Sequence, residues 1–129
     1  MNWYLEPWKK YADFSGRACR REYWIFTFGN SLIGMAVALP LMLLLTLSAS
    51  NGGNPPSWPF TLVFLLLFPF SLALIIPSLA VSIRRLHDAN LSGWFYLVGF
   101  IPCGGLLLFI LMLLPGTAGD NNYGPDPRP

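Results

Sequence analysis

The chain has 129 residues and a formal net charge of +2, and 54% of its residues are hydrophobic while only 11% are charged. Soluble domains carry about a quarter charged residues, and a nucleic-acid binder needs a continuous basic face, so this composition argues against both classes. The length suits one domain.

Two long runs of the sequence contain no charged residue. Neither the run from Tyr23 to Ile83 nor the run from Ala89 to Gly119 contains Asp, Glu, Lys, Arg or His. A lipid bilayer suits such runs, because it penalises a charge at a helix centre by roughly 2.5–3.5 kcal/mol. The sequence therefore predicts an all-α integral membrane protein. It would have an interfacial N-terminal segment (1–22), a membrane domain (23–116) with three transmembrane helices at about 23–48, 58–83 and 94–114, and a turn-rich tail (117–129).

The N-terminal segment has the pattern of a short amphipathic helix that lies on the membrane. Trp3, Trp8 and other aromatic or apolar residues fall on one helical face, while Lys9 and Lys10 fall on the other, which is an interfacial pattern. Pro7 favours a helix that begins there. The segment would anchor the first span, or alternatively dock a partner.

Arginines gather next to two of the predicted spans. With Ser15 as helix cap, Arg17, Arg20 and Arg21 would share one helical face, and Arg84 and Arg85 fall on the same predicted side of the membrane. Such arginines are candidates for contact with anionic phospholipid or another phosphate. General anchoring by lipid head groups and protein docking remain the alternatives.

Small and hydroxylated residues line one face of each of the first two spans. In lipid such stripes allow close helix packing, against each other or against a second subunit. Asn30 beside the first stripe could instead line a polar path. The stripes are Thr27, Ser31, Gly34 and Ala38 in the first span and Ser71, Ser78 and Ser82 in the second.

The charged stretch that follows the second span contains the sole histidine. Asn90 is expected to end the helix and Ser92 to cap the next one. His87 and Asp88 are suited to proton transfer, but no nucleophile motif, second carboxylate or metal-ligand set accompanies them. We therefore expect no catalytic residue, metal or cofactor. The motif of unknown role is His87, Asp88, Ser92, Gly93 and Trp94.

The topology follows from the basic residues. Seven of the eight Lys and Arg lie in residues 9–21 or at 84–85, so the positive-inside bias puts the N-terminus and the Arg84–Trp94 stretch in the cytoplasm. Three full spans would put the Asn51 loop and the tail outside. Pro102 to Gly105 interrupt the last span, and a re-entrant hairpin there would bring the tail to the side of Arg84.

Five motifs in order along the chain together suggest a known family. They are Tyr11-x-Asp13-Phe14-x-Gly16-Arg17-x-x-Arg20-x-Glu22-x-Trp24, Arg84-Arg85-Leu86-His87-Asp88, Ser92-Gly93-Trp94, Ile101-Pro102 and Gly119-x-Asn121-x-Tyr123-Gly124. With these motifs the chain resembles, along essentially its whole length, the bacterial YhaH/YhaI-type inner-membrane proteins, a family of unknown function (DUF805). The resemblance implies a bacterial inner-membrane location and brings no catalytic residue.

Three functions remain open at this point. The leading one is a structural or interaction role in the membrane with anionic-lipid contact at the cytoplasmic arginines. The second is a subunit of an oligomeric transporter or channel, lined by Asn30 and the serines, because three helices enclose little cavity alone. The third is a membrane enzyme acting on a phosphorylated lipid or carrier, with His87 as acid or base.

Overall fold

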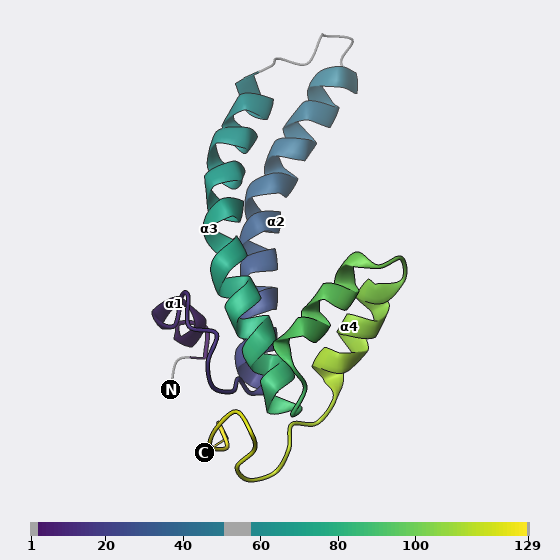
Figure 1. The fold of residues 1–129 in the computed structure, drawn as a ribbon. Helices are drawn as coiled ribbons and strands as arrows, with labels where there is room; N and C mark the ends of the chain where they lie inside the picture. The colour runs from purple at the N-terminus through teal and green to yellow at the C-terminus, as the bar shows by residue number, and fades with distance from the viewer. Residues whose placement is uncertain (1–2, 51–57, 129) are drawn as a thin grey trace. The chain divides into compact units, whose positions relative to one another are not determined.

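The computed structural model describes residues 3–50 and 58–128, except for the side chain of Val63. The predicted Asn51 loop lies outside the described residues. The described residues form helices and no strand, which confirms the all-α class, and Asn121 and Gly124 form one isolated bridge. The elements are α1 (Glu6–Lys9), α2 (Arg20–Ser50), α3 (Trp58–Asp88), the 3₁₀ helix η1 (Gly93–Phe100) and α4 (Gly104–Leu113) (Figure 1).

Two helices are long and apolar enough to cross a membrane. Helices α2 and α3 have 31 residues each, so each is about 46 Å long at 1.5 Å per residue, more than the roughly 30 Å of a hydrocarbon core. The first two predicted spans thus correspond to helices of sufficient length and apolar composition. Helix α2 begins three residues earlier than predicted and α3 ends five residues later, so both helices include charged residues at these ends.

The chain divides into two compact units, and one of them is residues 28–75. This unit holds the uncharged parts of α2 and α3. Large apolar side chains here are open to the surroundings: Leu32 is 65% exposed and Met42 63%. Such exposure suits contact with lipid rather than with water. A hollow of about 430 Å³ has both Ala38 and Ser71 in its lining.

The other unit comprises residues 1–27 and 76–129. Its core contains Phe26, Leu86 and Met112, together with fully buried arginines. Helix α1 is shorter than the predicted amphipathic segment, but its aromatic face is in place. The Trp8 ring packs edge-on against Phe26, with ring centroids 5.9 Å apart, while Lys9 and Lys10 are exposed.

The third apolar segment differs from the single helix predicted for 94–114. It is a hairpin in which η1 and α4 pack against each other (Figure 1). Pro102 lacks a backbone donor, and Cys103 has a left-handed conformation with φ of 65°, so the chain turns here. Helix α4 has 10 residues and is about 15 Å long, too short to cross the bilayer. The hairpin alternative therefore describes this segment.

The turn between α3 and η1 follows the sequence-based expectation. Helix α3 ends at Asp88, and Asn90 has a left-handed conformation with φ of 57°, which is common just after a helix end. The Ser92 hydroxyl accepts a hydrogen bond from the Trp94 backbone N–H. The predicted helix end near Asn90 and the predicted helix cap at Ser92 are both confirmed.

The start of α2 differs from the prediction. Ser15 does not cap the helix: its backbone N–H donates to the Asp13 carboxylate at 3.0 Å, forming a local turn typical of Asp. Gly16 follows with φ of +77°, and α2 begins only at Arg20. Arg17 therefore precedes the helix and does not share a helical face with Arg20 and Arg21.

Candidate functional site

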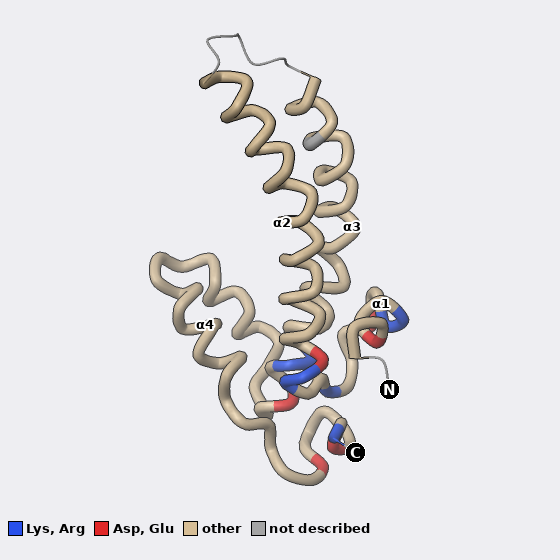
Figure 2. Tube along the Cα trace, turned by 180° about the vertical axis from the view of Figure 1, so that it is seen from behind, with Lys and Arg blue, Asp and Glu red and all other residues tan. Residues whose placement is uncertain are grey.

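In the unit formed by residues 1–27 and 76–129, charged residues concentrate where α2 begins and α3 ends (Figure 2). At the centre, Arg17 and Asp88 form an ion pair of 2.8 Å, and their side chains are only 1% and 3% exposed. Arg17 donates from both Nε and Nη2 to Asp88 Oδ1. Because Arg17 lies in the irregular segment ahead of α2, this pair ties the entry segment of one long helix to the end of the other.

A second arginine shares the same carboxylate. Arg85 donates from Nη1 to Asp88 Oδ2 at 2.6 Å, so each carboxylate oxygen has an arginine partner. Arg85 also donates to the carbonyls of Met112 and Leu114 at the end of α4. Charge-assisted hydrogen bonds of this kind are the strong ones, and here they fix the end of the apolar hairpin against α3.

The tail after α4 returns to the same place. The Thr117 backbone N–H donates to the Asp88 carbonyl at 2.8 Å, and Arg17 donates to the carbonyls of Thr117 and Gly119, each at 2.6 Å. At Gly116 a Cβ would lie 2.0 Å from Asp88 Oδ2, so only glycine allows this approach. The tail thus lies on the same side as the end of α3, and the prediction of a tail on the opposite side is wrong.

His87 joins the tail to the N-terminal turn. Its ring lies parallel to the Tyr123 ring, with centroids 4.0 Å apart, and its Nδ1 lies 3.2 Å from the Gly16 carbonyl. The Asn121 amide donates to the His87 carbonyl at 2.8 Å. These contacts bring together the family motifs from three distant parts of the sequence.

A separate buried ion pair lies between α2 and α3. Arg84 Nη1 is 3.1 Å from Glu22 Oε1, and the side chains are 1% and 7% exposed. The two groups have the separation of an ion pair without the alignment of a hydrogen bond. The Arg84 carbonyl also accepts from the Ala18 N–H at 3.0 Å. Loss of either charge would leave the other buried and uncompensated.

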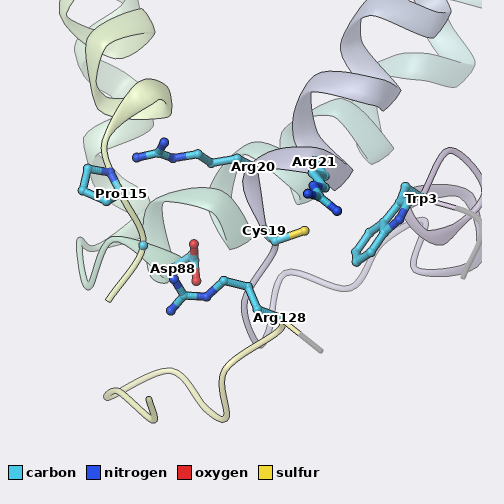
Figure 3. Close-up of a pocket in the computed structure, with 8 residues that line it drawn as sticks. Trp3, Cys19, Arg20, Arg21, Asp88, Pro115 and Arg128 are labelled. Atoms are coloured by element: carbon cyan, nitrogen blue, oxygen red, sulfur yellow. The ribbon is translucent and has the colours of Figure 1, made fainter. Parts of the chain in front are cut away.

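Beside the buried network is an open cavity of about 490 Å³ (Figure 3). Arg20 and Arg21 of α2 contribute to one wall, Trp3 lies next to Arg21, and Arg128 of the tail lies near Asp88. Arg20 and Arg21 are both exposed, and Arg20 Nε donates to the Leu114 carbonyl at 2.9 Å. The full lining is Trp3, Cys19, Arg20, Arg21, Asp88, Pro115, Gly116 and Arg128.

Arg128 is held in position within the tail. It donates to the Thr117 carbonyl at 2.7 Å and to Asp126 at 2.6 Å. These hydrogen bonds from Arg128 hold the pKa of the exposed Asp126 carboxyl below its usual range. The pair is exposed to solvent, so its role is to orient Arg128 rather than to stabilise the fold.

The five predicted lipid-contact arginines lie in one unit but do not form one surface. Arg17, Arg84 and Arg85 are buried against carboxylates, because their positive charge could leave water only with a partner. The accessible basic surface is therefore narrower than predicted, with Arg20 and Arg21 as its members. Arg128 joins them, although no local pattern in the sequence pointed to it.

The remaining motif residues are divided between two places. Asp88 belongs to the arginine network, while Ser92, Gly93 and Trp94 line a hollow of about 380 Å³ next to His87. A Cβ at Gly93 would lie 2.8 Å from an Ile83 side-chain carbon. Gly93 thus allows η1 to pack closely on α3.

The predicted packing stripes are only partly seen as close contacts. Ser71 and Ser82 donate to the carbonyls of Phe68 and Ser78 in their own helix, and a Cβ at Gly34 would meet nothing within 4 Å. Among the described residues, Gly34 thus makes no close helix approach. Thr27 and Ser82 both lie beside the Tyr23 hydroxyl. Packing of the other stripe members on a second subunit stays a prediction.

Metal binding has no visible basis in the part of the chain that the structure describes, which holds no group of three or more His, Cys, Asp or Glu side chains suited to an ion. Cys19 is buried and Cys103 is exposed, and neither is in a disulfide.

Sequence reasoning missed several members of the site. The tail was read as a set of turn-formers, although Thr117 and Asn121 hold it to α3. Glu22 was not recognised as the partner of Arg84. A signal was present, because a carboxylate next to a membrane span needs a partner, but the sequence could not identify which arginine supplies it.

The fold and the site together define a helical membrane protein with one charged end, where ion pairs and hydrogen bonds join the segment before α2, the end of α3 and the tail. The chain matches the family described as "Protein of unknown function (DUF805)" over residues 11–125, and it belongs to this family. It is 40% identical to Inner membrane protein YhaI of Escherichia coli (strain K12) over 99% of this chain and 97% of that protein. Inner membrane protein YhaH of the same strain is 36% identical over 99% and 98% of the two chains. No solved structure matches.

These relatives give the location. Two inner membrane proteins align with the chain over nearly their full length, so the protein is an inner membrane protein. A more distant relative, Uncharacterized protein YiiR, is 30% identical over 88% of the chain. The resemblance drawn from the motifs is confirmed.

Proposed function

We propose that this protein has a structural or interaction role in the bacterial inner membrane and contacts anionic phospholipid through Arg20 and Arg21. Both side chains are exposed and line a cavity, while the three other arginines nearby are buried and already paired, Arg17 and Arg85 with Asp88 and Arg84 with Glu22. Accessible arginines at the end of a membrane helix attract anionic head groups by about 1 kcal/mol each. The open cavity at Arg20 and Arg21 is the observation that supports this role most.

The orientation is part of the same proposal. The N-terminus and the end of α3 face the cytoplasm, where anionic lipid and the positive-inside bias favour Lys and Arg. Since the tail is hydrogen-bonded to Asp88 and His87, it faces the cytoplasm as well. All eight basic residues then lie on one side of the membrane.

The enzyme alternative has less support. His87 Nδ1 is beside the Gly16 carbonyl and its ring is stacked on Tyr123, and Asp88 accepts from Arg17 and Arg85. A carboxylate neutralised by two arginines is a poor base. These groups serve the architecture better than they serve proton transfer.

The test measures lipid binding in purified protein. Native mass spectrometry in detergent with added phosphatidylglycerol or phosphatidylcholine compares the natural chain with Arg20→Gln/Arg21→Gln. We expect phosphatidylglycerol affinity to fall roughly tenfold or more, since two charges contribute about 2 kcal/mol together.

The matched control is Lys9→Gln/Lys10→Gln, which removes the same charge from exposed positions outside the cavity lining. It should change phosphatidylglycerol affinity much less. Equal loss in the two double variants would mean that net charge alone attracts the lipid, and no loss in either would refute the proposed contact.

A further inference from the structure

We propose that the cavity at Arg20, Arg21 and Arg128 selects a lipid whose head group ends in a phosphate monoester. This rests on the proposed function and names the kind of anionic lipid that the site takes. The cavity volume of about 490 Å³ falls in the range of small-molecule pockets, roughly 300–1,000 Å³. It has room for a phosphate together with the glycerol that bears it.

The charge of the cavity exceeds what a phosphodiester can neutralise. Arg20, Arg21 and Arg128 line the cavity. Arg17 and Arg85 form ion pairs with Asp88, which also belongs to the lining. The carboxylates paired with these five arginines are Asp88 and Asp126. Five positive charges and two negative ones give this group of side chains a net charge of +3. A phosphodiester supplies one negative charge, whereas a phosphate monoester supplies about 1.5 to 2 at neutral pH.

Asp88 is the only carboxylate among the described residues of the lining, and it does not repel such a ligand strongly. Both oxygens of Asp88 already accept hydrogen bonds, Oδ1 from Arg17 and Oδ2 from Arg85. Its charge is therefore compensated by two arginines that are not part of the cavity lining. The arginines of the lining remain to interact with an anion.

Arg21 is the group with donors to spare. Among the residues that the structure describes, it has no hydrogen-bond or ion-pair partner, whereas Arg20 uses Nε on Leu114 and Arg128 is bound to Asp126. A guanidinium presents a planar fork that matches phosphate oxygens in pairs. Arg21 is thus placed to hold the terminal oxygens, while the Arg20 side chain points away from it toward Pro115 (Figure 3).

The position of these arginines on α2 is a second, independent observation. Arg20 and Arg21 are the first two residues of a 31-residue helix, and a helix N-terminus favours negative charge and disfavours positive charge. Two arginines at this helix N-terminus are therefore electrostatically unfavourable. Locally unfavourable residues in natural chains concentrate at functional sites. A bound dianion would interact favourably with both the helix dipole and the arginines.

The lipid anchor follows from the surroundings. Trp3 forms one wall of the cavity (Figure 3), and tryptophan is typical of the membrane–water interface. Leu113 at the end of α4 and Leu114 directly after it are 47% and 40% exposed. Acyl chains can therefore run along this apolar surface while the phosphate occupies the cavity.

The experiment compares two lipids that differ by one methyl ester. Phosphatidate carries a phosphate monoester, and phosphatidylmethanol of the same acyl chains carries the smallest diester. Native mass spectrometry of the full chain should show phosphatidate bound about fivefold more tightly, the effect of one extra charge near a basic surface. Equal affinity for the two lipids would overturn the inference.

Soluble phosphates identify the source of the head group. Glycerol 3-phosphate and inorganic phosphate, added at the concentration at which phosphatidate half-saturates the protein, should not displace it. Displacement by either would overturn the lipid assignment and indicate a soluble phosphate ligand.

Variants test which arginines cause the preference for phosphatidate over phosphatidylmethanol. Arg21→Gln should bring the ratio of the two affinities close to one, and Lys10→Gln should leave it unchanged. An unaltered thermal unfolding curve of Arg21→Gln would show that the fold is intact. A ratio that survives Arg21→Gln together with Arg128→Gln would overturn the inference.

The same lipid comparison distinguishes a failure of the monoester preference from a failure of the proposed function. Binding of phosphatidylglycerol and phosphatidate with equal strength, both above phosphatidylcholine, would refute the monoester preference and leave anionic-lipid contact in place. Binding of neither above phosphatidylcholine would refute both.

Discussion

Arg17 and Asp88 are 71 positions apart in the sequence, and their buried side chains meet at 2.8 Å. Around this pair the chain joins the start of α2, the end of α3 and the tail that follows α4. Removing one partner of a buried ion pair typically costs 3–5 kcal/mol, because the other charge is left uncompensated. The pair is therefore expected to control whether the charged end assembles.

Asp88→Asn tests this expectation. The variant leaves Arg17 and Arg85 buried with no carboxylate between them, so we expect the free energy of unfolding in mixed micelles to fall by about 3 kcal/mol or more. Asp120→Asn, which alters an exposed carboxylate of the tail, should change it by less than about 0.5 kcal/mol. Similar values for the two variants would contradict a central role of Asp88.

The apolar hairpin has its own test in two adjacent glycines. A Cβ at Gly104 would lie 1.8 Å from the Val98 carbonyl oxygen, whereas a Cβ at Gly105 would meet nothing within 4 Å. Gly104→Ala should therefore destabilise the protein by roughly 1–3 kcal/mol through overpacking. Gly105→Ala should be neutral or slightly stabilising. The same mixed-micelle unfolding measurement checks both, and a neutral Gly104→Ala would exclude the close approach of η1 and α4.

Contact between the tail and α3 can be detected by cross-linking. In a chain with Cys19→Ala and Cys103→Ser, the pair His87→Cys and Tyr123→Cys should react with a short bis-maleimide, since the natural rings stack at 4.0 Å. The product would migrate faster on a denaturing gel. The two single-cysteine variants and protein unfolded before the reagent is added serve as controls. A pair that reacts no better than unfolded protein would argue against a tail held at α3.

Local chemistry accounts for what the sequence could predict. The charge-free runs predicted lipid-embedded helices, and Asn90 and Ser92 marked a helix end and a helix start correctly because each acts on its own backbone. Pro102 and Gly105 marked an interruption, but the same residues suit a kinked span and a hairpin. The choice depends on the contact of Gly104 with Val98 and on the return of the tail, which are tertiary contacts.

The candidate site was predictable only in part, for a related reason. Arginine at a membrane boundary suits both lipid head groups and buried carboxylates. The sequence contained Asp88 and Glu22 but not their pairing with Arg17 and Arg84, which requires the chain to be folded. Exposed Arg20 and Arg21 differ from their buried neighbours by position rather than by any local signal.

The location of the tail tests the account most directly, because the whole network requires the tail on the same side of the membrane as Asp88. Alkaline phosphatase and a cytoplasmic fluorescent protein should be fused in turn after Arg128, and after Ser50 in a truncated chain as the opposite-side control. The account predicts an inactive phosphatase and a fluorescent reporter after Arg128, with the reverse readings after Ser50. An active phosphatase and a dark reporter after Arg128 would place the tail across the membrane and contradict the account.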